Sequence, residues 1–151
     1  DSEEKEELST DHEVVANLGE HGYTTQIRTG NHSFIADEPA KVGGADLGPT
    51  PYELVSAGLA ACTSMTIQMY ARRKNWSIQN VETHVSYSKK HADDCENCED
   101  AGAKIDTFER EISIKGDLDE KQLERVLQIA DKCPVHKTLS STGKINSKLR
   151  D

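Results

Sequence analysis

The sequence of 151 residues contains no long apolar run, no basic cluster and few aromatic side chains. No stretch approaches the roughly 18 apolar residues of a membrane span, and the N-terminal residues lack the basic-then-apolar order of a secretion signal. Without a basic patch interleaved with aromatic residues, nucleic-acid binding is not expected. Four cysteines are few for a secreted disulfide-stabilised domain of this size. We therefore expect a cytoplasmic protein with reduced or catalytic thiols.

Negative charge is concentrated at the beginning of the chain. Residues 1–13 contain seven acidic residues and one lysine, so that this segment carries −6 of the net charge of −9. A highly charged segment with little apolar surface is typical of a solvated tail. The sequence predicts an acidic disordered tail over 1–12 and one folded domain over 13–151, which is long enough to bury a core.

The predicted secondary structure mixes strands and helices. Three short strands are expected first, at 13–18, 23–29 and 32–37, with glycine-containing turns between them. The elements that follow are a helix at 51–74, strands at 78–90 and 106–115, a helix capped by Asp117 or Asp119 and ending at 132–134, and a final strand near 142–149. The second helix carries an apolar stripe of Leu123, Val126, Leu127 and Ala130. Together these elements predict an α+β domain.

The helix predicted at 51–74 is apolar over most of its length. Thr50 is placed to cap it, Pro51 occupies its first position, and Glu53 completes a capping box. No charged residue occurs from Leu54 to Met65, and a helix that is apolar on every face is buried on every face. The small sheet of one chain cannot easily enclose such a helix. We therefore expect an obligate homodimer in which the partner chain covers part of it.

Two of the cysteines lie in settings that favour thiol chemistry. Cys62 is inside the apolar helix, where a cysteine taken alone is often only a small buried apolar residue. Cys133 immediately precedes Pro134 at a predicted helix start, where unpaired N–H groups and the helix dipole favour a thiolate. Lys132 and His136 are close in sequence and would add positive charge. The alternative is that Cys133 only caps the turn, as serine would.

A peroxide-reducing cycle becomes chemically natural if the fold brings Cys62 and Cys133 together. One thiolate attacks the O–O bond and becomes a sulfenic acid, and the other thiol condenses with it to a disulfide that an external reductant resets. This cycle needs no organic cofactor and no metal. Because burial alone raises the pKa of a thiol, Cys62 needs a cation or a hydrogen-bond donor to lower it. Arg28 and Lys41 are the candidate cations.

Three segments of the chain resemble the OsmC/Ohr family of osmotically inducible and organic-hydroperoxide-resistance proteins. They are 48–54 (GPTPYEL), 60–65 (AACTSM) and 132–135 (KCPV), and the order of the elements between them is also similar, so that the resemblance covers about 14–149. It implies an α+β fold of antiparallel sheets around a long buried central helix, in an intertwined homodimer with active sites at the subunit interface. It also implies that Cys62 is the peroxidatic cysteine and Cys133 the resolving cysteine.

The activity that this resemblance implies is thiol-dependent reduction of organic hydroperoxides, with a thiol or lipoyl-type reductant as partner. The start of the helix departs from the family pattern. The peroxidases usually have Asn-Pro-Glu there, and the Glu holds a catalytic Arg. Here Tyr52 follows Pro51 and the carboxylate belongs to Glu53, about 100° further round the helix. Glu53 is therefore either a catalytic residue or only part of the capping box, and no position matches the catalytic arginine.

This departure keeps a second function open. The protein would then be a redox sensor, or would bind a small apolar ligand, with little peroxidase turnover. Slow and stoichiometric oxidation of the thiols would favour this function, whereas sustained consumption of hydroperoxide would favour the peroxidase. The sequence is closer to a less characterised OsmC-like branch, with which it shares the pattern at 91–99 and at 133–136.

The other two cysteines, Cys95 and Cys98, have the two-residue spacing of redox dithiols and of zinc knuckles. With His91 they offer three candidate metal ligands, whereas a structural zinc site normally has four. The acidic residues around them raise thiol pKa values and favour a cation over a nucleophilic dithiol. Three interpretations remain open: a plain loop pair or easily formed disulfide, a zinc site, and an accessory redox pair.

Overall fold

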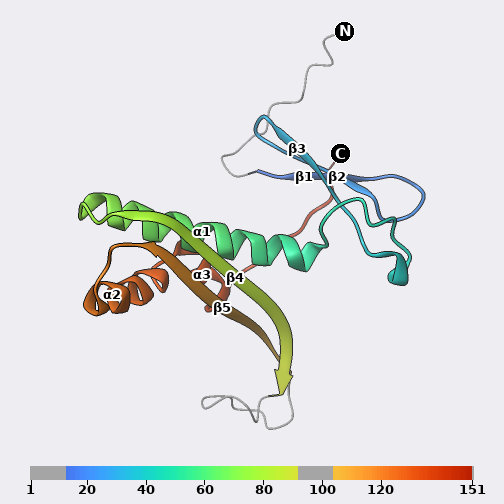
Figure 1. Cartoon of the computed structure of the whole chain (residues 1–151). Helices are drawn as coiled ribbons and strands as arrows, with labels where there is room; N and C mark the ends of the chain where they lie inside the picture. The colour runs from blue at the N-terminus through green and yellow to red at the C-terminus, as the bar shows by residue number, and fades with distance from the viewer. Residues whose placement is uncertain (1–12, 92–103, 151) are drawn as a thin grey trace. The chain divides into compact units, whose positions relative to one another are not determined.

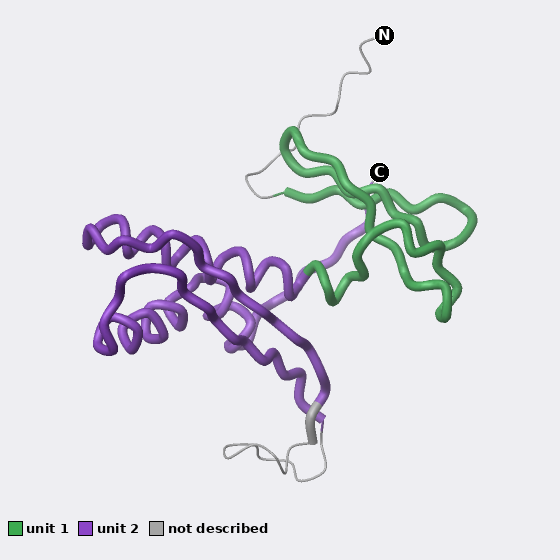
Figure 2. Tube along the Cα trace, viewed as in Figure 1, with its two compact units in different colours: residues 1–54 green, residues 55–151 purple. Residues whose placement is uncertain are grey.

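The computed structural model of the protein describes residues 13–91 and 104–150, apart from the side chains of residues 90 and 91. Its elements are, in chain order, β1 (Val15–Leu18), β2 (Thr25–Thr29), β3 (His32–Ala36), the short 3-10 helix η1 (Ala40–Val42), α1 (Pro51–Arg73), β4 (Ile78–His91), β5 (Lys104–Gly116), α2 (Glu120–Ala130) and α3 (Pro134–Leu139) (Figure 1). They form two compact units, residues 1–54 and 55–151 (Figure 2). The tail predicted at 1–12 lies outside the described residues.

The first unit contains a three-stranded antiparallel sheet in the order β1-β2-β3. Val15 pairs with Arg28, and Thr29 pairs with His32, so that only Gly30 and Asn31 connect β2 to β3. Gly30 has a φ of 54°, a left-handed conformation that glycine adopts without steric strain. The three strands predicted from the sequence are confirmed, each one or two residues shorter than expected.

The buried carboxylate of Asp37, directly after β3, fixes the loop that leads to α1. It accepts hydrogen bonds from the Thr24 hydroxyl (2.9 Å) and from the backbone N–H groups of Glu38 (2.8 Å), Leu47 (3.3 Å) and Ala45 (3.4 Å). Burial raises the pKa of Asp37, but these hydrogen bonds to its charged form outweigh burial and lower it. The ionised side chain therefore holds several backbone groups of the loop at once.

Two glycines allow the same loop to lie close to the main chain of β3 and of the residues directly after it. A Cβ atom added at Gly44 would be 1.8 Å from the carbonyl oxygen of Glu38, and one added at Gly48 would be 1.9 Å from that of Ile35. Both contacts are with backbone atoms, which cannot rotate away as a flexible side chain can. The glycines of this loop are therefore required by packing.

Helix α1 begins as the sequence predicts. The Thr50 N–H donates to Glu53 Oε1 (3.0 Å), and the Glu53 N–H donates to Thr50 Oγ1 (3.3 Å), which together form the capping box. Its buried residues recur every fourth position and form one stripe: Leu59, Thr63, Ile67 and Ala71. Met65 and Met69, outside this stripe, are 64% and 57% exposed. In a single chain, burial of α1 is thus confined to one stripe, and an apolar face stays open.

Helices α1 and α2 pack on one face of the antiparallel β4–β5 hairpin in the second unit (Figure 1). The fully buried core consists of Ile67 from α1 and of Val126, Ile129 and Ala130 from α2. The partly buried residues around it are Tyr70, Trp76, Ile78, Val81, Ile112, Ile114 and Leu118. By length and composition alone, α1 is the one helix among residues 13–91 and 104–150 that could cross a membrane. A core helix passes the same test, and Ile67 places α1 in the core.

Helix α2 confirms the predicted cap and corrects the predicted stripe. Asp119 is the N-cap, and it exchanges hydrogen bonds with Gln122 in a capping box. The sequence predicted Leu123 and Leu127 on the buried stripe, but these side chains are 41% and 60% exposed, and Ile129 is buried instead. The buried residues Val126, Ile129 and Ala130 lie within an arc of about 100° around the helix, and Leu123 and Leu127 lie outside that arc.

The final strand predicted near 142–149 is wrong for the single chain. These residues form no helix or strand, and the apolar side chains of Ile145 and Leu149 are almost fully exposed. A strand requires a neighbour that pairs with its backbone groups. Among the described residues, both sheets are formed from β1 to β5 alone. No strand in the described part of the chain is paired with this segment, so its backbone lacks the partner that a strand needs.

Candidate active site

Cys62 and Cys133, which are 71 positions apart in the sequence, lie close enough for each thiol to shift the pKa of the other. Cys62 is on α1, directly before the buried Thr63. Cys133 is the N-cap of α3 and is fully buried. Both thiols are free. The structure thus brings together the two thiols that the sequence singled out.

The chain between α2 and α3 turns sharply, which points Cys133 inward. The Cys133 N–H donates to the carbonyl of Ala130 (3.2 Å), the last residue of α2. Pro134 then occupies the first position of α3, where its missing N–H leaves no donor unpaired. The carbonyl of Cys133 accepts from the Lys137 N–H (3.1 Å) and closes the first turn of α3. The sequence-based prediction of Cys133 as an N-cap is confirmed.

The sulfur of Cys62 is surrounded by neutral hydrogen-bond donors. They are the Cys133 thiol, the Val135 backbone N–H and the Thr66 hydroxyl, whose oxygen is 4.0 Å from the sulfur. Burial raises the pKa of Cys62, but these three hydrogen bonds to the thiolate outweigh burial and lower it. From the sequence we expected a cation or a hydrogen-bond donor near Cys62, and the structure places hydrogen-bond donors there.

Cys133 shows the opposite shift. Burial raises the pKa of Cys133, and so do the hydrogen bond that its thiol gives to Cys62 and the negative charge of that neighbour. The backbone N–H groups of His136 and Val135 only partly offset these effects. The expectation that the helix start favours a thiolate at Cys133 is therefore wrong, because its burial and its role as a donor dominate. Within the pair, the pKa of Cys62 is therefore lowered and that of Cys133 is raised.

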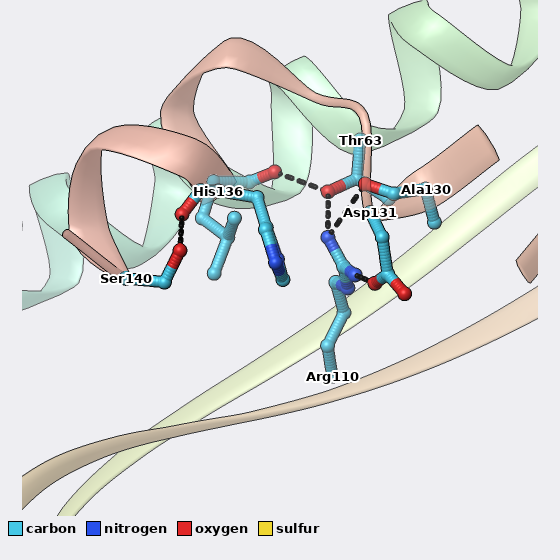
Figure 3. A network of polar contacts seen from close by, with 7 residues as sticks. Thr63, Arg110, Ala130, Asp131, His136 and Ser140 are labelled. Carbon is cyan, nitrogen blue, oxygen red and sulfur yellow. Dashed lines mark hydrogen bonds and ion pairs between the residues drawn. The ribbon is translucent and has the colours of Figure 1, made fainter. Parts of the chain in front are cut away.

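Arg110 on β5 is the nearby residue that the sequence analysis missed. Its Nη1 atom donates to Thr63 Oγ1 (3.0 Å) and to the carbonyl of Ala130 (3.2 Å), and its Nη2 atom donates to Asp131 Oδ1 (2.9 Å) (Figure 3). The Arg110 side chain is only 12% exposed. A sequence signal was available, since Arg110 lies between Phe108 and Ile112 at the even spacing of the inward-facing residues of β5. A charge at such a position is unusual in a strand.

A cavity of about 480 Å³ lies next to Arg110 in the second unit. Its lining combines apolar residues, Leu59, Phe108 and Leu127 among them, with the polar side chains of Arg110, Asp131 and His136. Two of these lining residues, Arg110 on β5 and His136 on α3, are drawn in Figure 3. Neither Cys62 nor Cys133 lines this cavity. It is therefore a neighbour of the thiol pair and not its entrance.

The remaining candidates from the sequence belong to the first unit. Arg28 lies in β2, Lys41 in η1, and Glu53 in the first turn of α1. Hydrogen bonds from the Thr50 N–H and with the Thr50 hydroxyl lower the pKa of Glu53. The capping box therefore accounts for Glu53 locally. Catalytic roles for Glu53 and Arg28, and an activating role for Lys41, stay predictions.

The candidate metal ligands lie at the edge of the described chain. Cys95 and Cys98 are outside the described residues, and His91 is the last residue of β4. Among residues 13–91 and 104–150, no group of three or more His, Cys, Asp or Glu side chains is placed to hold a metal ion. The three interpretations of the CxxC pair therefore all stand.

The family model of OsmC-like proteins matches residues 43–148, a span that includes both thiols. This chain belongs to the OsmC-like protein family. No curated protein sequence matches it. The family resemblance stated from the sequence is confirmed.

Solved structures share the fold at low sequence identity. An OsmC-like protein from Mycoplasma pneumoniae is 19% identical, with a TM-score of 0.67 over 87% of this chain and 89% of that one. An organic hydroperoxide resistance protein OsmC from Legionella pneumophila is 20% identical, with a TM-score of 0.62 over 89% and 92%. One from Elizabethkingia anophelis, with thiocyanate bound, is 16% identical, with a TM-score of 0.63 over 88% and 91%. These likenesses confirm the α+β fold with antiparallel sheets and a long helix.

Proposed function

We propose that the protein is a thiol-dependent peroxidase that reduces organic hydroperoxides, with Cys62 as the attacking residue and Cys133 as the resolving one. The observation that carries this proposal is the pairing of the two thiols, with the pKa of Cys62 lowered and that of Cys133 raised. A thiolate is the nucleophilic form of cysteine, and a protonated neighbour is suited to the later condensation step. Membership of the OsmC-like family and the hydroperoxide-resistance proteins that share its fold support the substrate class.

The first half of the proposed cycle oxidises Cys62. Its thiolate attacks the distal oxygen of the hydroperoxide, the S–O bond forms, and the O–O bond breaks. The alkoxide that leaves takes a proton from water and departs as the alcohol. Cys62 is then a sulfenic acid, oxidised by two electrons, and the peroxide has been reduced by two.

The second half forms and then reduces a disulfide. The Cys133 sulfur bonds to the Cys62 sulfur, the S–O bond of the sulfenic acid breaks, and the hydroxyl leaves with the thiol proton as water. A dithiol reductant then attacks the disulfide, and its own oxidation to a disulfide returns both cysteines to thiols. The reductant that we propose is a thiol or a lipoyl-type dithiol. The cycle needs no metal and no organic cofactor, and we place it in the cytoplasm, where reductants are abundant.

The functional unit that we propose is a homodimer. The open face of α1 with Met65 and Met69 is apolar, more than half of each side chain is exposed, and a second copy of the chain would remove it from water. An intertwined arrangement would also provide neighbours for the C-terminal residues 142–149. This proposal retains the dimer that the sequence predicts.

A redox sensor is the competing function, and one specific observation favours it. Among the residues that the structure describes, the hydrogen-bond donors at Cys62 are all neutral, so that the charge of a departing alkoxide would receive no help from these groups. The Cys62 thiol of such a site would react slowly with hydroperoxide, and each chain would react only once. In the proposed peroxidase, by contrast, catalytic amounts of protein consume cumene hydroperoxide continuously with excess dihydrolipoamide. Consumption that stops at one equivalent per chain would establish the sensor instead.

The matched variants for this assay are Cys62→Ser, Cys133→Ser and Cys133→Ala. Cys62→Ser should abolish consumption, because no thiolate remains to attack the peroxide. With dihydrolipoamide, Cys133→Ser should turn over slowly through direct reduction of the sulfenic acid, and it should lose activity progressively by overoxidation. Equal activity in Cys62→Ser and wild type would remove Cys62 from the proposed role.

A further inference from the structure

Arg110 is a charged residue on the core-facing side of the sheet, where a charged side chain is stable only if it has specific partners. It pairs with Val85 across the β4–β5 hairpin and faces the side of the sheet that carries the core. Removing a guanidinium from water is costly unless acceptors replace the water. Three acceptors do so here: Thr63 Oγ1, the carbonyl of Ala130 and Asp131 Oδ1. Their positions in the chain identify what Arg110 connects.

The first acceptor belongs to the segment that carries Cys62. Thr63 is the next residue on α1, it is fully buried, and its hydroxyl donates to the Leu59 carbonyl (2.7 Å). Because that hydrogen atom is used within the helix, a lone pair of Thr63 Oγ1 faces Arg110. The hydrogen bond from Arg110 Nη1 to Thr63 (Figure 3) is therefore directional, and it fixes α1 at the residue that follows Cys62.

The other two acceptors belong to the segment that carries Cys133. The carbonyl of Ala130 accepts from Arg110 Nη1 and also from the Cys133 N–H, each at 3.2 Å. One oxygen thus joins Arg110 directly to the backbone of the second cysteine. Asp131 Oδ1, two residues before Cys133, accepts from Nη2 at 2.9 Å. A single guanidinium therefore binds both cysteine-bearing segments.

We propose that Arg110 is a positioning residue for disulfide formation, holding the helix of Cys62 and the α2–α3 junction of Cys133 at the spacing that lets the two sulfurs bond. This inference rests on the proposed peroxidase function and adds a residue to it. A disulfide forms only when the Cβ atoms are about 3.5–4.5 Å apart and correctly oriented. The planar fork of an arginine can hold three acceptors at once, which the ammonium group of a lysine cannot do with the same geometry.

The inference separates two steps of the cycle. Attack on the peroxide depends on the thiolate of Cys62, whose hydrogen-bond donors do not include Arg110. Condensation depends on the approach of Cys133 to the sulfenic acid at Cys62. Loss of Arg110 should therefore leave the first step within about twofold of wild type and slow the second about tenfold, an effect typical of lost orientation. The sulfenic acid then lives longer, and a second hydroperoxide oxidises it to a sulfinic acid.

The variants that test this are Arg110→Met, Arg110→Lys and Thr63→Val, with Arg125→Met as the matched control. Arg125 also joins α2 to α1, because its Nε atom donates to the Tyr70 hydroxyl (3.2 Å), but this contact lies about two helical turns beyond Cys62 and involves none of the three acceptors of Arg110. Rapid mixing with cumene hydroperoxide and quenching at set times gives the amounts of sulfenic acid, disulfide and sulfinic acid by mass. Circular dichroism verifies that each variant is folded.

We expect Arg110→Met to accumulate sulfenic and then sulfinic acid at Cys62, Thr63→Val and Arg110→Lys to show a smaller effect, and Arg125→Met to behave as wild type. Equal slowing in Arg110→Met and Arg125→Met would reduce Arg110 to a general packing contact. Disulfide formation at the wild-type rate in folded Arg110→Lys and Thr63→Val would also overturn the proposal, even if Arg110→Met failed to fold.

A second measurement does not depend on peroxide. Equilibration of the reduced protein with oxidised glutathione forms the Cys62–Cys133 disulfide by two exchange steps, each of which releases one glutathione thiol. The equilibrium reports how well the two sulfurs are prearranged. We expect it to shift about tenfold toward the dithiol in Arg110→Met and not in Arg125→Met. If wild type fails to react with hydroperoxide yet this shift is found, the peroxidase proposal fails and the positioning role stands. An unchanged equilibrium overturns the positioning role.

Discussion

Cys62 and Cys133 interact directly, and burial together with hydrogen bonding leaves the pKa of Cys62 lowered and that of Cys133 raised. The two cysteines are thereby different in character before any peroxide arrives. Cys62 has the lowered pKa that a nucleophile needs, and Cys133 retains the proton that must leave as water in the condensation step. The asymmetry comes from hydrogen bonding and burial.

Removing the thiol donor should shift the titration of Cys62. A lowered pKa means that Cys62 becomes a thiolate at a lower pH than an ordinary cysteine, so that its alkylation by iodoacetamide begins at lower pH. Cys133→Ala removes one donor, which raises the pKa of Cys62, moves the alkylation profile to higher pH and slows alkylation several-fold at neutral pH. Cys133→Ser keeps a hydroxyl donor and should stay closer to wild type. An identical profile in Cys133→Ala would show that this hydrogen bond does not tune Cys62.

The carboxylate of Asp37 should make a pH-dependent contribution to stability. Its pKa is lower in the folded protein than in the unfolded chain, so that its stabilisation is complete above the unfolded value of about 3.9 and is lost as the pH falls through the folded pKa. Asp37→Asn should therefore lower Tm by several degrees at neutral pH, and the difference should shrink below about pH 4. Thermal unfolding followed by circular dichroism at several pH values measures this.

The matched control for Asp37 is Asp46→Asn, an exposed position of the same loop. It should stay within about 0.5 kcal/mol of wild type, as surface substitutions usually do. A Tm difference for Asp37→Asn that stays constant from neutral to acid pH would contradict this. It would show that the variant is destabilised by altered hydrogen-bond geometry and not by the loss of the negative charge.

Gly48 should not tolerate a side chain. In Gly48→Ala the new Cβ would lie 1.9 Å from the Ile35 carbonyl oxygen, so that the loop or β3 must shift. We expect a loss of about 1–3 kcal/mol in the free energy of unfolding, measured with urea. Gly19→Ala is the control, because no atom lies within 4 Å of the added Cβ there, and it should change stability by less than about 0.5 kcal/mol. Equal stability of the two variants would contradict the close approach at Gly48.

The open face of α1 should be an interface between two copies of the chain. Sedimentation of the wild type is expected to give a dimer, and Met65→Glu or Met69→Glu should produce monomer, because a charge would have to be buried without a partner. Val42→Glu, at an exposed apolar residue of η1, should leave the dimer intact. A wild-type monomer at every concentration, or a dimer unaffected by both methionine variants, would contradict the proposed assembly.

The sequence predicted much of this structure because its signals are local. The capping box of Thr50 and Glu53 spans only four residues. Cys133 directly before Pro134 predicts a helix start, and the motifs around the two thiols indicate the family. The predictions that failed depend on distant contacts. Arg110 meets Thr63 from 47 positions away, and no local pattern shows that contact. The direction in which the pKa of Cys133 shifts was predicted wrongly. A helix start can be recognised in a sequence, whereas burial and the neighbouring thiol cannot.

The strand predicted near 142–149 failed for a related reason. A strand forms only when a neighbouring strand pairs with its backbone, and none of the described residues does so here. Leu127 was misplaced because the sequence does not show which arc of α2 faces the core, and that arc holds Val126, Ile129 and Ala130. In both cases the sequence shows which residues favour burial but not what is available to bury them.

The central claim is tested most directly by intact-mass and peptide analysis of the reduced protein before and after an equimolar amount of cumene hydroperoxide, together with Cys62→Ser and Cys133→Ser. The account predicts rapid loss of the mass of two hydrogen atoms, mapped to a Cys62–Cys133 disulfide. It also predicts a sulfenic acid trapped at Cys62 in Cys133→Ser and no rapid change in Cys62→Ser. Unmodified thiols at both positions, or oxidation confined to Cys95 and Cys98, would contradict it.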